Sequence, residues 1–287
     1  MKKYPRVLTI AGSDSGGGAG IQADIKSISA TGSYAASAIT AITVQNTVGV
    51  TAVHGVPTDI ICGQIEAVVR DIGVDAVKIG MLSSIEVVRA VRSTLDSLAS
   101  DASLPEDVRR GVRNIVLDPV MVATSGDRLI DEDAVKVLSA ELAPYARVLT
   151  PNIPEAEILS GSKISSQDQL PEVGRSLSRA MEAVSGRKVS VLMKAGHLED
   201  EELVDYFYNA EEDRVVELRS RRVHSPNTHG TGCTLSSAFA SYLAQGLSLD
   251  DAARSAKNYI AAAIEHGAGY EIGHGHGPVD HFFKLHF

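Results

Sequence analysis

A glycine-rich turn that runs straight into an apolar segment is the feature of this sequence that bears most directly on chemistry. The turn reads His-Gly-Thr-Gly-Cys-Thr at 229–234, and Leu-Ser-Ser-Ala-Phe-Ala follows at 235–240. Glycines let the backbone fold closely around an oxyanion, and the free amides and positive dipole end of a following helix point at it. A thiol at that place, Cys233, is expected to have a lowered pKa. The pattern predicts an anion site with a built-in nucleophile or base, although a tight turn with a small buried cysteine fits the same residues.

A second glycine-rich turn, Gly-Ser-Asp-Ser-Gly-Gly-Gly-Ala-Gly at 12–20, also lies between an expected strand and an expected helix. Two such loops suggest one ligand that is held at both ends. No glycine is followed by lysine, which excludes a P-loop, and the protein-kinase motifs HRD and DFG are absent. Residues 18–23 fit G-x-G-x-x-A, but Gln45 lies near the place where a dinucleotide site needs a carboxylate. We therefore do not expect a dinucleotide.

The composition argues against several classes of partner. The chain has 287 residues, of which 44% are hydrophobic and 22% charged, and its formal net charge is −9. That charge does not attract a polyanion, and 5% aromatic residues without tryptophan offer few stacking platforms for a single strand. We therefore do not expect nucleic acid as a partner. No stretch reaches the roughly 18 to 20 apolar residues of a membrane span, so we do not expect a membrane as a partner either, and we expect a cytoplasmic location. Cys62 and Cys233 are the only cysteines, which predicts reduced thiols.

Short β-branched runs alternate with longer amphipathic or alanine-rich stretches, which is typical of βα units around a mostly parallel sheet. Expected strands are 6–10, 36–43, 51–56, 76–79, 114–118, 148–150, 189–194, 203–209 and 215–218. Expected helices are 21–31, 58–72, 84–100, 131–142, 154–159, 167–183, 231–245 and 248–266. Most glycine- or proline-bearing turns directly follow a strand, at the edge where open α/β sheets bind ligands. We expect a single domain over residues 1–287.

Two polar segments need a separate interpretation. Residues 101–113 are mixed in charge and contain Pro105, which favours a solvated connection. The tail Gly-His-Gly-His-Gly-Pro at 273–278, together with His281, invites a metal site, but no carboxylate or cysteine completes a spaced ligand set. A flexible, glycine-rich closing segment is the preferred interpretation of this tail.

Motifs spread over the whole chain occur in the order found in one family. They are AGSDSGGGAGIQAD at 11–24, TVQNT at 43–47, DPVM at 118–121, TPN at 150–152, Lys194 and HGTGCT at 229–234. Between about residue 6 and about residue 278, the chain resembles the bacterial hydroxymethylpyrimidine/phosphomethylpyrimidine kinases of thiamine biosynthesis. The resemblance implies a ribokinase-like fold, which is a three-layer α/β/α sandwich with a mostly parallel central sheet, and a homodimer.

The same resemblance implies two ATP-dependent phosphorylations, first of the hydroxymethyl oxygen of 4-amino-5-hydroxymethyl-2-methylpyrimidine and then of the phosphate just installed. In-line phosphoryl transfer needs mainly positioning and charge stabilisation. Gly230, Thr231, Gly232 and Cys233 are expected to hold the transferred group with their amides. The wider superfamily usually has aspartate where this chain has Cys233, whose thiolate is the expected base for the alcohol. The second acceptor is a phosphate monoester, which is already mostly ionised and needs little help from a base.

The resemblance places the acceptor pocket at the first loop and Gln45. A carboxamide offers one donor and one acceptor, which match the adjacent polar atoms of an aminopyrimidine. Asp24 is expected to take the exocyclic amine or the alcohol. Close backbone approach and apolar faces are expected from Gly12, Ala19, Val44, Met81 and Val120. Core positions for Val44 and Val120, and a helix-face charge for Asp24, stay open as alternatives.

The nucleotide and its metal are expected at the other end of the site. Residues 152–155 have the Asn-x-x-Glu spacing that this superfamily uses beside the metal-phosphate site. Mg²⁺ favours oxygen ligands and keeps several waters, so Asp118 and Glu155 are expected to position the hydrated ion. Lys194, Asn152 and Thr228 are expected to contact ATP, and K⁺ is a further candidate ion. A helix-capping role for Glu155 and an ordinary strand-end charge for Lys194 stay open.

Two alternatives to a pyrimidine kinase stay open. Pyridoxal kinases share the fold and the cysteine-bearing loop, and they phosphorylate a similar ring. The second alternative is a catalytically silent pyrimidine-binding module, against which the joint presence of Lys194, Glu155, Asp118 and Cys233 argues. Ala195, where family members often have a second glycine, leaves the approach of the backbone to the nucleotide open.

Overall fold

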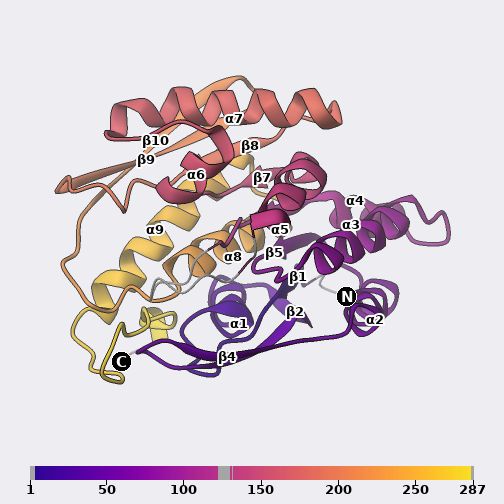
Figure 1. The fold of residues 1–287 in the computed structure, drawn as a ribbon, viewed down its shortest axis with the longest axis horizontal. Helices are drawn as coiled ribbons and strands as arrows, with labels where there is room; N and C mark the ends of the chain where they lie inside the picture. Colours follow the sequence, from indigo (N-terminus) through magenta and orange to yellow (C-terminus); the bar gives the residue numbers. More distant parts are fainter. Residues whose placement is uncertain (1–3, 122–129, 131, 286–287) are drawn as a thin grey trace.

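An eight-stranded sheet forms the centre of the computed structural model, which describes residues 4–121, 130 and 132–285 (Figure 1). The strand order is β10-β9-β8-β7-β6-β5-β1-β2, and neighbours pair in parallel except β10 with β9 and β9 with β8. The bounds are β1 (Arg6–Ala11), β2 (Tyr34–Ile39), β5 (Ala76–Ile79), β6 (Ile115–Leu117), β7 (Val148–Leu149), β8 (Ser190–Met193), β9 (Glu202–Asn209) and β10 (Arg214–Arg221). The predicted, mostly parallel sheet is confirmed.

Helices cover both faces of the sheet, so the fold has three layers. One face is covered by α1 (Gly20–Ala30), α8 (Thr231–Ala244) and α9 (Leu249–Gly267). The other is covered by α2 (Thr58–Ala67), α3 (Ile85–Ser100), α4 (Glu106–Arg113), α5 (Glu132–Val137), α6 (Ile153–Ser160) and α7 (Leu170–Ser185). In Figure 1, α8 and α9 lie on one side of the strands, and α3 and α4 lie on the other. This arrangement confirms the predicted α/β/α sandwich.

Alternating side chains along the central strands explain the layering. In β1, Val7 belongs to the apolar cluster with α8 and α9, whereas Leu8 and Ile10 belong to the cluster with α2 and α3. In β5, Ala76 belongs to the cluster with α8 and α9, and Val77 belongs to the cluster with α2 and α3. A parallel sheet buries both of its faces, so its strands form nearly continuous apolar runs that are easily located in a sequence.

The predicted strand 36–43 is wrong in its extent, because the chain leaves the central sheet at Thr40. Beyond that residue, β3 (Ala41–Gln45) pairs antiparallel with β4 (Val50–Gly55) in a separate two-stranded ribbon. Thr40 is buried and donates its hydroxyl to the Met81 carbonyl at 2.9 Å. This tertiary contact turns the chain out of the sheet, and a continuous run of strand-forming residues does not reveal it.

Residues 101–113 are not the solvated connection that their composition predicted. Helix α4 begins after Pro105 and buries Val108 and Val112 in the apolar core. Acidic residues lie in its first turn and basic residues in its last, which suits the helix dipole. The average polarity of the segment concealed a narrow apolar face.

Two predicted helices contain π-helical turns. Helix α2 continues as η1 (Val68–Ile72), and α5 continues as η2 (Leu138–Leu142), followed by a 3₁₀ turn, η3 (Ala143–Tyr145). Residue 131, where one predicted helix begins, lies outside the described residues. Short 3₁₀ turns, η4 (Gln167–Gln169) and η5 (Phe283–Leu285), complete the fold. Among the described helices, none has the length and apolarity that a membrane crossing requires.

The C-terminal tail is not the free, flexible segment that its glycines suggested. The His276 amide donates to the Thr47 carbonyl at 2.8 Å, and the His229 amide donates to the Gly277 carbonyl at 3.0 Å. His281 is buried. Within the described residues, no group of three or more His, Cys, Asp or Glu side chains is placed to hold a metal ion.

Candidate active site

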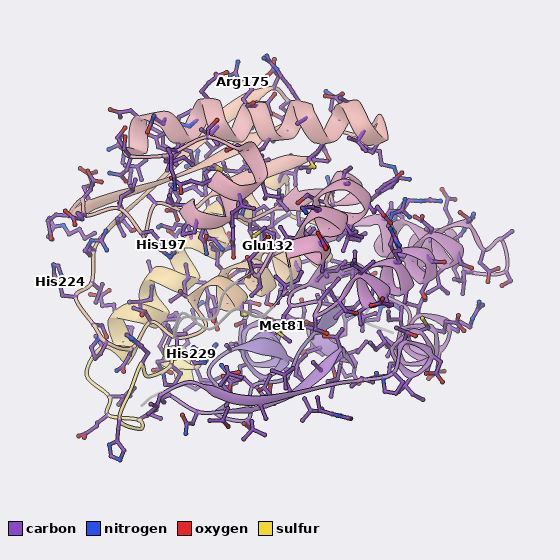
Figure 2. All side chains as sticks on the ribbon, in the orientation of Figure 1. Met81, Glu132, Arg175, His197, His224 and His229 are labelled. Atoms are coloured by element: carbon purple, nitrogen blue, oxygen red, sulfur yellow. The ribbon has the colours of Figure 1, made fainter. Side chains whose placement is uncertain are left out.

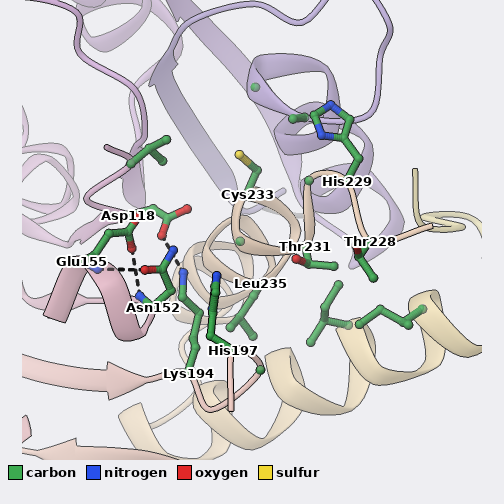
Figure 3. A pocket seen from close by; sticks show the side chains of 18 of the residues that line it. Asp118, Asn152, Glu155, Lys194, His197, Thr228, His229, Thr231, Cys233 and Leu235 are labelled. Atoms are coloured by element: carbon green, nitrogen blue, oxygen red, sulfur yellow. Dashed lines mark hydrogen bonds and ion pairs between the residues drawn. The ribbon is translucent and has the colours of Figure 1, made fainter. Parts of the chain in front are cut away.

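A cavity of about 670 Å³ lies at the carboxyl ends of the parallel strands. Residues in or directly after β1, β5, β6, β7 and β8 line it, and the first turn of α8 and part of α9 close it. This is the edge at which open α/β sheets bind ligands. In Figure 3, Asp118, Asn152, Glu155 and Lys194 gather on one side, His229 lies on the opposite side, and Cys233 lies between them.

Most of the predicted site residues line this cavity, although they are scattered over the sequence. The structure thereby brings together the residues expected to bind the acceptor, the nucleotide and the metal. They are Gly12, Ala19, Gln45, Met81, Asp118, Val120, Asn152, Glu155, Lys194, Thr228, Gly230, Thr231, Gly232 and Cys233. Asp24 and Val44 do not reach the cavity.

Asp24 lies below the cavity as the counter-ion of a buried lysine. Its two carboxylate oxygens both lie 2.9 Å from Lys78 Nζ, and both side chains are 0% exposed. Thr9 and Ser237 donate their hydroxyls to Asp24 at 2.6 and 2.7 Å. Its acceptor positions thus face protein donors, which contradicts the prediction that Asp24 binds the substrate. The alternative of a helix-face charge fits better, because Asp24 lies on α1 and pairs with Lys78, although the pair is buried.

Val44 lies on the outer face of the ribbon, with 59% of its surface exposed. Successive strand residues point to opposite faces, and its neighbours Thr43 and Gln45 line the cavity. Val44 therefore points away from the cavity. The structure contradicts both the predicted contact with the acceptor and the alternative of a core position.

The start of α8 has the geometry expected of an anion site. Gly230 has a left-handed φ of 80°, and a Cβ there would lie 1.8 Å from the Gly18 carbonyl oxygen. In the described part of the chain, no group accepts a hydrogen bond from the amides of Gly232 and Cys233, and both residues line the cavity. Free amides at a helix N-terminus attract anions.

The pKa of the Cys233 thiol is raised, which contradicts the predicted lowering. Cys233 keeps partial exposure to the cavity, but protein surrounds its sulfur. This burial raises the pKa to about 11, although the Lys78 ammonium and a hydrogen bond from the Gly20 amide lower it. The carboxylates of Asp24 and Asp118 add to the rise. The cost of removing a thiolate from water thus outweighs the attraction of the helix end, and Cys233 is a neutral thiol at neutral pH.

Lys194, Asp118 and Glu155 form a buried charged group beside Gly232. Lys194 Nζ lies 3.0 Å from Asp118 Oδ1, and a Cβ on Gly232 would lie 3.3 Å from Asp118 and 3.4 Å from Lys194. Burial lowers the pKa of Lys194, but the two carboxylates outweigh it and raise the pKa. Burial raises the pKa of Glu155 to about 7, with Lys194 opposing the rise and Asp118 adding to it. One lysine thus faces two carboxylates, and this excess of acidic groups favours the binding of a second cation.

Asn152 and Glu155 hold each other at the start of α6. The Asn152 side-chain oxygen accepts from the Glu155 amide at 2.9 Å, and Glu155 Oε2 accepts from the Asn152 amide at 2.9 Å. This capping box explains the Asn-x-x-Glu spacing in purely structural terms. Glu155 also lines the cavity, so the capping role that the sequence left open is confirmed without removing Glu155 from the site.

A hydrogen bond between side chains joins the two glycine-rich loops, and it was not foreseen from the sequence. His229 Nε2 lies 2.8 Å from Asp14 Oδ2. The Asp14 carboxylate also accepts from the amides of Gly16, Gly18 and Ala19 at 2.8 to 3.0 Å. Burial raises the pKa of Asp14, but the hydrogen bonds from His229, Ala19 and Gly16 outweigh it and lower the pKa. These amides are occupied, so the first loop shapes the cavity instead of offering free donors to an anion.

The carboxamide of Gln45 is oriented by its neighbours at the rim of the cavity. Gln45 Oε1 lies 3.2 Å from the Thr43 hydroxyl, and Gln45 Nε2 lies 3.4 Å from His229 Nε2. His229 Nε2 donates to the Asp14 carboxylate, so it cannot also accept a hydrogen bond from Gln45. Gln45 Nε2 and His229 Nε2 are therefore two donors that lie near each other without a hydrogen bond between them. The amide N–H groups of Gln45 can therefore serve a ligand.

Ala195 does not obstruct the cavity. Its side chain is fully buried among apolar residues of α6, α7 and β8, and its amide donates to Asp205 Oδ1 at 2.8 Å. The neighbouring residues Lys194, Gly196 and His197 form the cavity wall. Alanine in place of glycine thus leaves the approach to the cavity unchanged.

Lys78 and His197 also line the cavity, although the sequence interpretation assigned them no role. A lysine within the short apolar strand 76–79 is an unusual residue for a buried position, and that was the available signal for Lys78. Burial and the Lys194 charge lower the pKa of His197, so its ring is neutral. Figure 2 shows His197 near β9 and β10, and Met81 and His229 nearer to β4.

The family model and the sequence relatives indicate one family. A family model described as Phosphomethylpyrimidine kinase matches residues 14–280. The chain is 46% identical over 278 residues to the hydroxymethylpyrimidine/phosphomethylpyrimidine kinase of Rhizobium meliloti, covering 96% of this chain and 97% of that protein. It is 48% identical over 281 residues to the thiamine biosynthesis bifunctional protein ThiED of Geobacter sulfurreducens, covering 97% of this chain. The chain spans only 53% of that bifunctional protein.

A solved structure shares the fold but carries another name. It is the ADP complex of Bacillus subtilis pyridoxal kinase, with a TM-score of 0.82 and 33% identity, covering 99% of this chain and 100% of that one. The fold alone therefore does not separate the two kinds of kinase, whereas the family model covers nearly the whole chain. This chain belongs to the phosphomethylpyrimidine kinase family.

Proposed function

We propose that this protein uses ATP to phosphorylate 4-amino-5-hydroxymethyl-2-methylpyrimidine, first to its monophosphate and then to its diphosphate, in thiamine biosynthesis. One observation carries the proposal. The amides of Gly232 and Cys233 share a cavity with the Lys194 ammonium and the carboxylates of Asp118 and Glu155. Phosphoryl transfer needs such donors and cations around the transferred group. The family and the named relative from Rhizobium meliloti support the choice of substrate.

The acceptor ring is proposed to lie between the first loop and Gln45. A Cβ on Gly12 would lie 2.4 Å from the Met81 methyl group, so glycine lets Met81 approach the first loop closely as an apolar wall. Ala19 and Val120 line the same region. The Gln45 carboxamide would recognise the polar edge of the aminopyrimidine.

The nucleotide is proposed to occupy the opposite half of the cavity. Lys194, Asn152 and Thr228 would contact its phosphates, and Leu235 and Ile260 belong to an apolar wall beyond them. Such a wall suits a flat heterocycle. The ADP complex of the Bacillus subtilis pyridoxal kinase supports a nucleotide site in this fold.

Asp118 and Glu155 fit a hydrated Mg²⁺ that is shared with the nucleotide phosphates. The raised pKa of Glu155, about 7, reflects burial beside a second carboxylate, and a divalent cation would relieve this repulsion. Two carboxylates do not enclose an ion, so waters and phosphate oxygens would complete its ligands. When bound, the ion would supply neutralising charge at the transferred phosphoryl group.

In the alcohol step, the thiolate form of Cys233 is proposed to accept the hydroxyl proton and become the thiol, while the α8 amides stabilise the transferred group. Only a small fraction of Cys233 is ionised at neutral pH, because its pKa is about 11. The alcohol step should therefore be limited by the thiolate fraction. In the phosphate step the nucleophile is already ionised, since its second pKa is about 6, and Cys233 is not needed as a base.

Pyridoxal kinase is the second candidate, because the structural neighbour from Bacillus subtilis bears that name. ADP release would be measured with Mg²⁺-ATP and three acceptors: the pyrimidine alcohol, its phosphate and pyridoxal. We expect turnover with both pyrimidines and a diphosphate product by mass spectrometry. Faster turnover of pyridoxal without a diphosphate would favour pyridoxal kinase, and pyrimidine binding without ADP release would favour a binding module. Replacing K⁺ by Na⁺ in the same assay tests a potassium requirement.

A homodimer and a single domain over residues 1–287 are also proposed. Ile42 and Val44 lie two residues apart on the outer face of β3 and are 45% and 59% exposed. Neighbouring exposed aliphatic side chains on a narrow ribbon favour burial against a second copy. Sedimentation velocity of the wild type and of Val44→Lys tests this: the variant should shift towards monomer. The cytoplasmic location stays a prediction.

A further inference from the structure

We propose that the closing strap, residues 273–281, positions Gln45 for the acceptor by fastening the tip of the β3–β4 ribbon to the loop before α8. The inference rests on the proposed function, because it concerns acceptor binding in the same cavity. It assigns a role to the glycine-rich tail, which the kinase mechanism does not otherwise use.

The strap binds the ribbon through Thr47, two residues after Gln45. The His276 amide donates to the Thr47 carbonyl at 2.8 Å. The amides of His274 and Gly275 both donate to the Thr47 hydroxyl, each at 3.2 Å. Three strap amides thus converge on one residue at the ribbon tip.

The alternating glycines of the strap make these contacts sterically possible. A Cβ on Gly273, which has a φ of 74°, would lie 2.2 Å from the Thr47 hydroxyl oxygen. A Cβ on Gly275 would lie 2.0 Å from the Thr47 carbonyl oxygen, and a Cβ on Gly277 would lie 2.0 Å from Asn227 Oδ1. These distances are far below van der Waals contact, so any other residue must push the strap off its partners.

The other end of the strap is fixed to the loop that bears His229. The Gly277 carbonyl accepts from the His229 amide at 3.0 Å, and Pro278 forms a parallel bridge with His229. His281 is buried against the hydroxyl of Thr234, in the first turn of α8, at 3.0 Å. The strap therefore has one end on the loop before α8 and the other on the ribbon.

The ribbon depends on such external support. A two-stranded sheet by itself has only marginal stability, and β3 and β4 form a sheet that is separate from the central one. Ser13 and Ser15 bind it near Thr43 and Gln45, for example through the Ser15 hydroxyl to the Gln45 carbonyl at 2.7 Å. The strap adds the hydrogen bonds to Thr47 at the tip of the ribbon. Loosening it should displace Gln45 without touching Lys194 or Asp118, so acceptor binding should suffer and ATP binding should not.

Steady-state kinetics of Gly275→Ala, Thr47→Val and Thr47→Ser test the inference. Loss of one or two hydrogen bonds predicts a KM for the pyrimidine alcohol that is about 10-fold higher in Gly275→Ala and Thr47→Val, with an unchanged KM for ATP. Thr47→Ser keeps the hydroxyl and should behave as the wild type. His276→Ala is the matched control, because that side chain is exposed and its amide is retained.

Hydrogen exchange of residues 44–49, followed by mass spectrometry, is a readout that does not depend on activity. We expect faster exchange in Gly275→Ala and Thr47→Val, with unfolding midpoints like that of the wild type. Equal rises in both KM values, or unchanged exchange and unchanged KM, would overturn the proposal. If the wild type fails to phosphorylate the pyrimidine while exchange still responds to the strap variants, the proposed function falls and the strap-to-ribbon coupling stands.

Discussion

His229 Nε2 lies 2.8 Å from Asp14 Oδ2, and this hydrogen bond joins the two glycine-rich loops although the two residues are 215 positions apart in the sequence. The same carboxylate gathers three amides of the first loop. One buried side chain therefore ties the first glycine-rich loop together and connects it to the loop before α8.

Replacing Asp14 by Asn should lower stability. The amide keeps the shape of the carboxylate but has only one acceptor oxygen for four donors, so buried donors lose their partner. We expect the free energy of unfolding to fall by about 1–3 kcal/mol in urea titrations. Asp71→Asn, at an exposed position, is the control and should stay within about 0.5 kcal/mol of the wild type. An unchanged midpoint for Asp14→Asn would contradict the organising role of the carboxylate.

Cys233→Ala should separate the two phosphorylations. A base contributes about 10²- to 10⁴-fold, and we expect a loss of that order for the alcohol. The phosphate acceptor is ionised without help, so its rate should fall much less. Single-turnover rates with each acceptor give the comparison. Equal losses in both steps would show that Cys233 acts through packing or phosphate binding instead of proton transfer.

The pH dependence of the two steps should differ. Because the pKa of Cys233 is about 11, its thiolate fraction rises tenfold per pH unit below that value. The alcohol step should therefore speed up from pH 7 towards pH 10, and the phosphate step should be nearly flat above about pH 7. Alkylation of the Cys62→Ala variant by iodoacetamide measures the same titration directly. A plateau in that rate near pH 7 would refute a neutral thiol.

Removing the charge of Asp24 should destabilise the protein strongly, because it leaves the buried Lys78 without a counter-ion. We expect Asp24→Asn to cost about 3–5 kcal/mol, and the double variant with Lys78→Met to recover most of that loss. Urea titrations of the two single variants and the double variant measure the coupling. If Asp24→Asn raised only the KM for the acceptor at full stability, Asp24 would be a substrate ligand after all.

Acid should weaken the fold through His281. Burial lowers the pKa of His281 to about 4 from the ordinary value of 6.5. Between these values the unfolded chain binds a proton that the folded chain does not, so stability is complete above pH 6.5 and falls as the pH drops towards 4. The slope should reach about 1.4 kcal/mol per pH unit at most. Unfolding at several pH values should show a shallower slope for His281→Gln, and no such change for the exposed His274→Gln.

The position of the site could be predicted because its segments share one simple property. Lys194, Asp118 and the loop 12–20 each follow an apolar strand, and strand ends of a parallel sheet meet at one edge. Periodicity also located the helices, since an apolar face repeats every three to four residues. These local signals suffice for the layers and for the edge at which the cavity forms.

The direction of individual side chains could not be predicted in the same way. Whether Asp24 or Lys78 faces the cavity depends on how α1 is placed relative to β5 in the folded protein, which local sequence does not determine. The exit of the chain at Thr40 likewise depends on a bond to Met81, 41 residues away. The pKa of Cys233 depends on its burial and on groups from three other segments, which are α1, β5 and the residue after β6, so the helix-end rule by itself predicted the opposite sign.

The wide sequence separation of the parts that meet at His229 has a consequence for synthesis on the ribosome. The parallel strands are complete once residue 193 has emerged, whereas the phosphate loop and its strap lie between 229 and 281. Domains assemble as their parts become available, so a growing chain can build most of its sheet before it has a working cavity. A chain that has grown only to the end of β8 therefore lacks the parts that close the cavity, so the cavity is completed after the parallel strands.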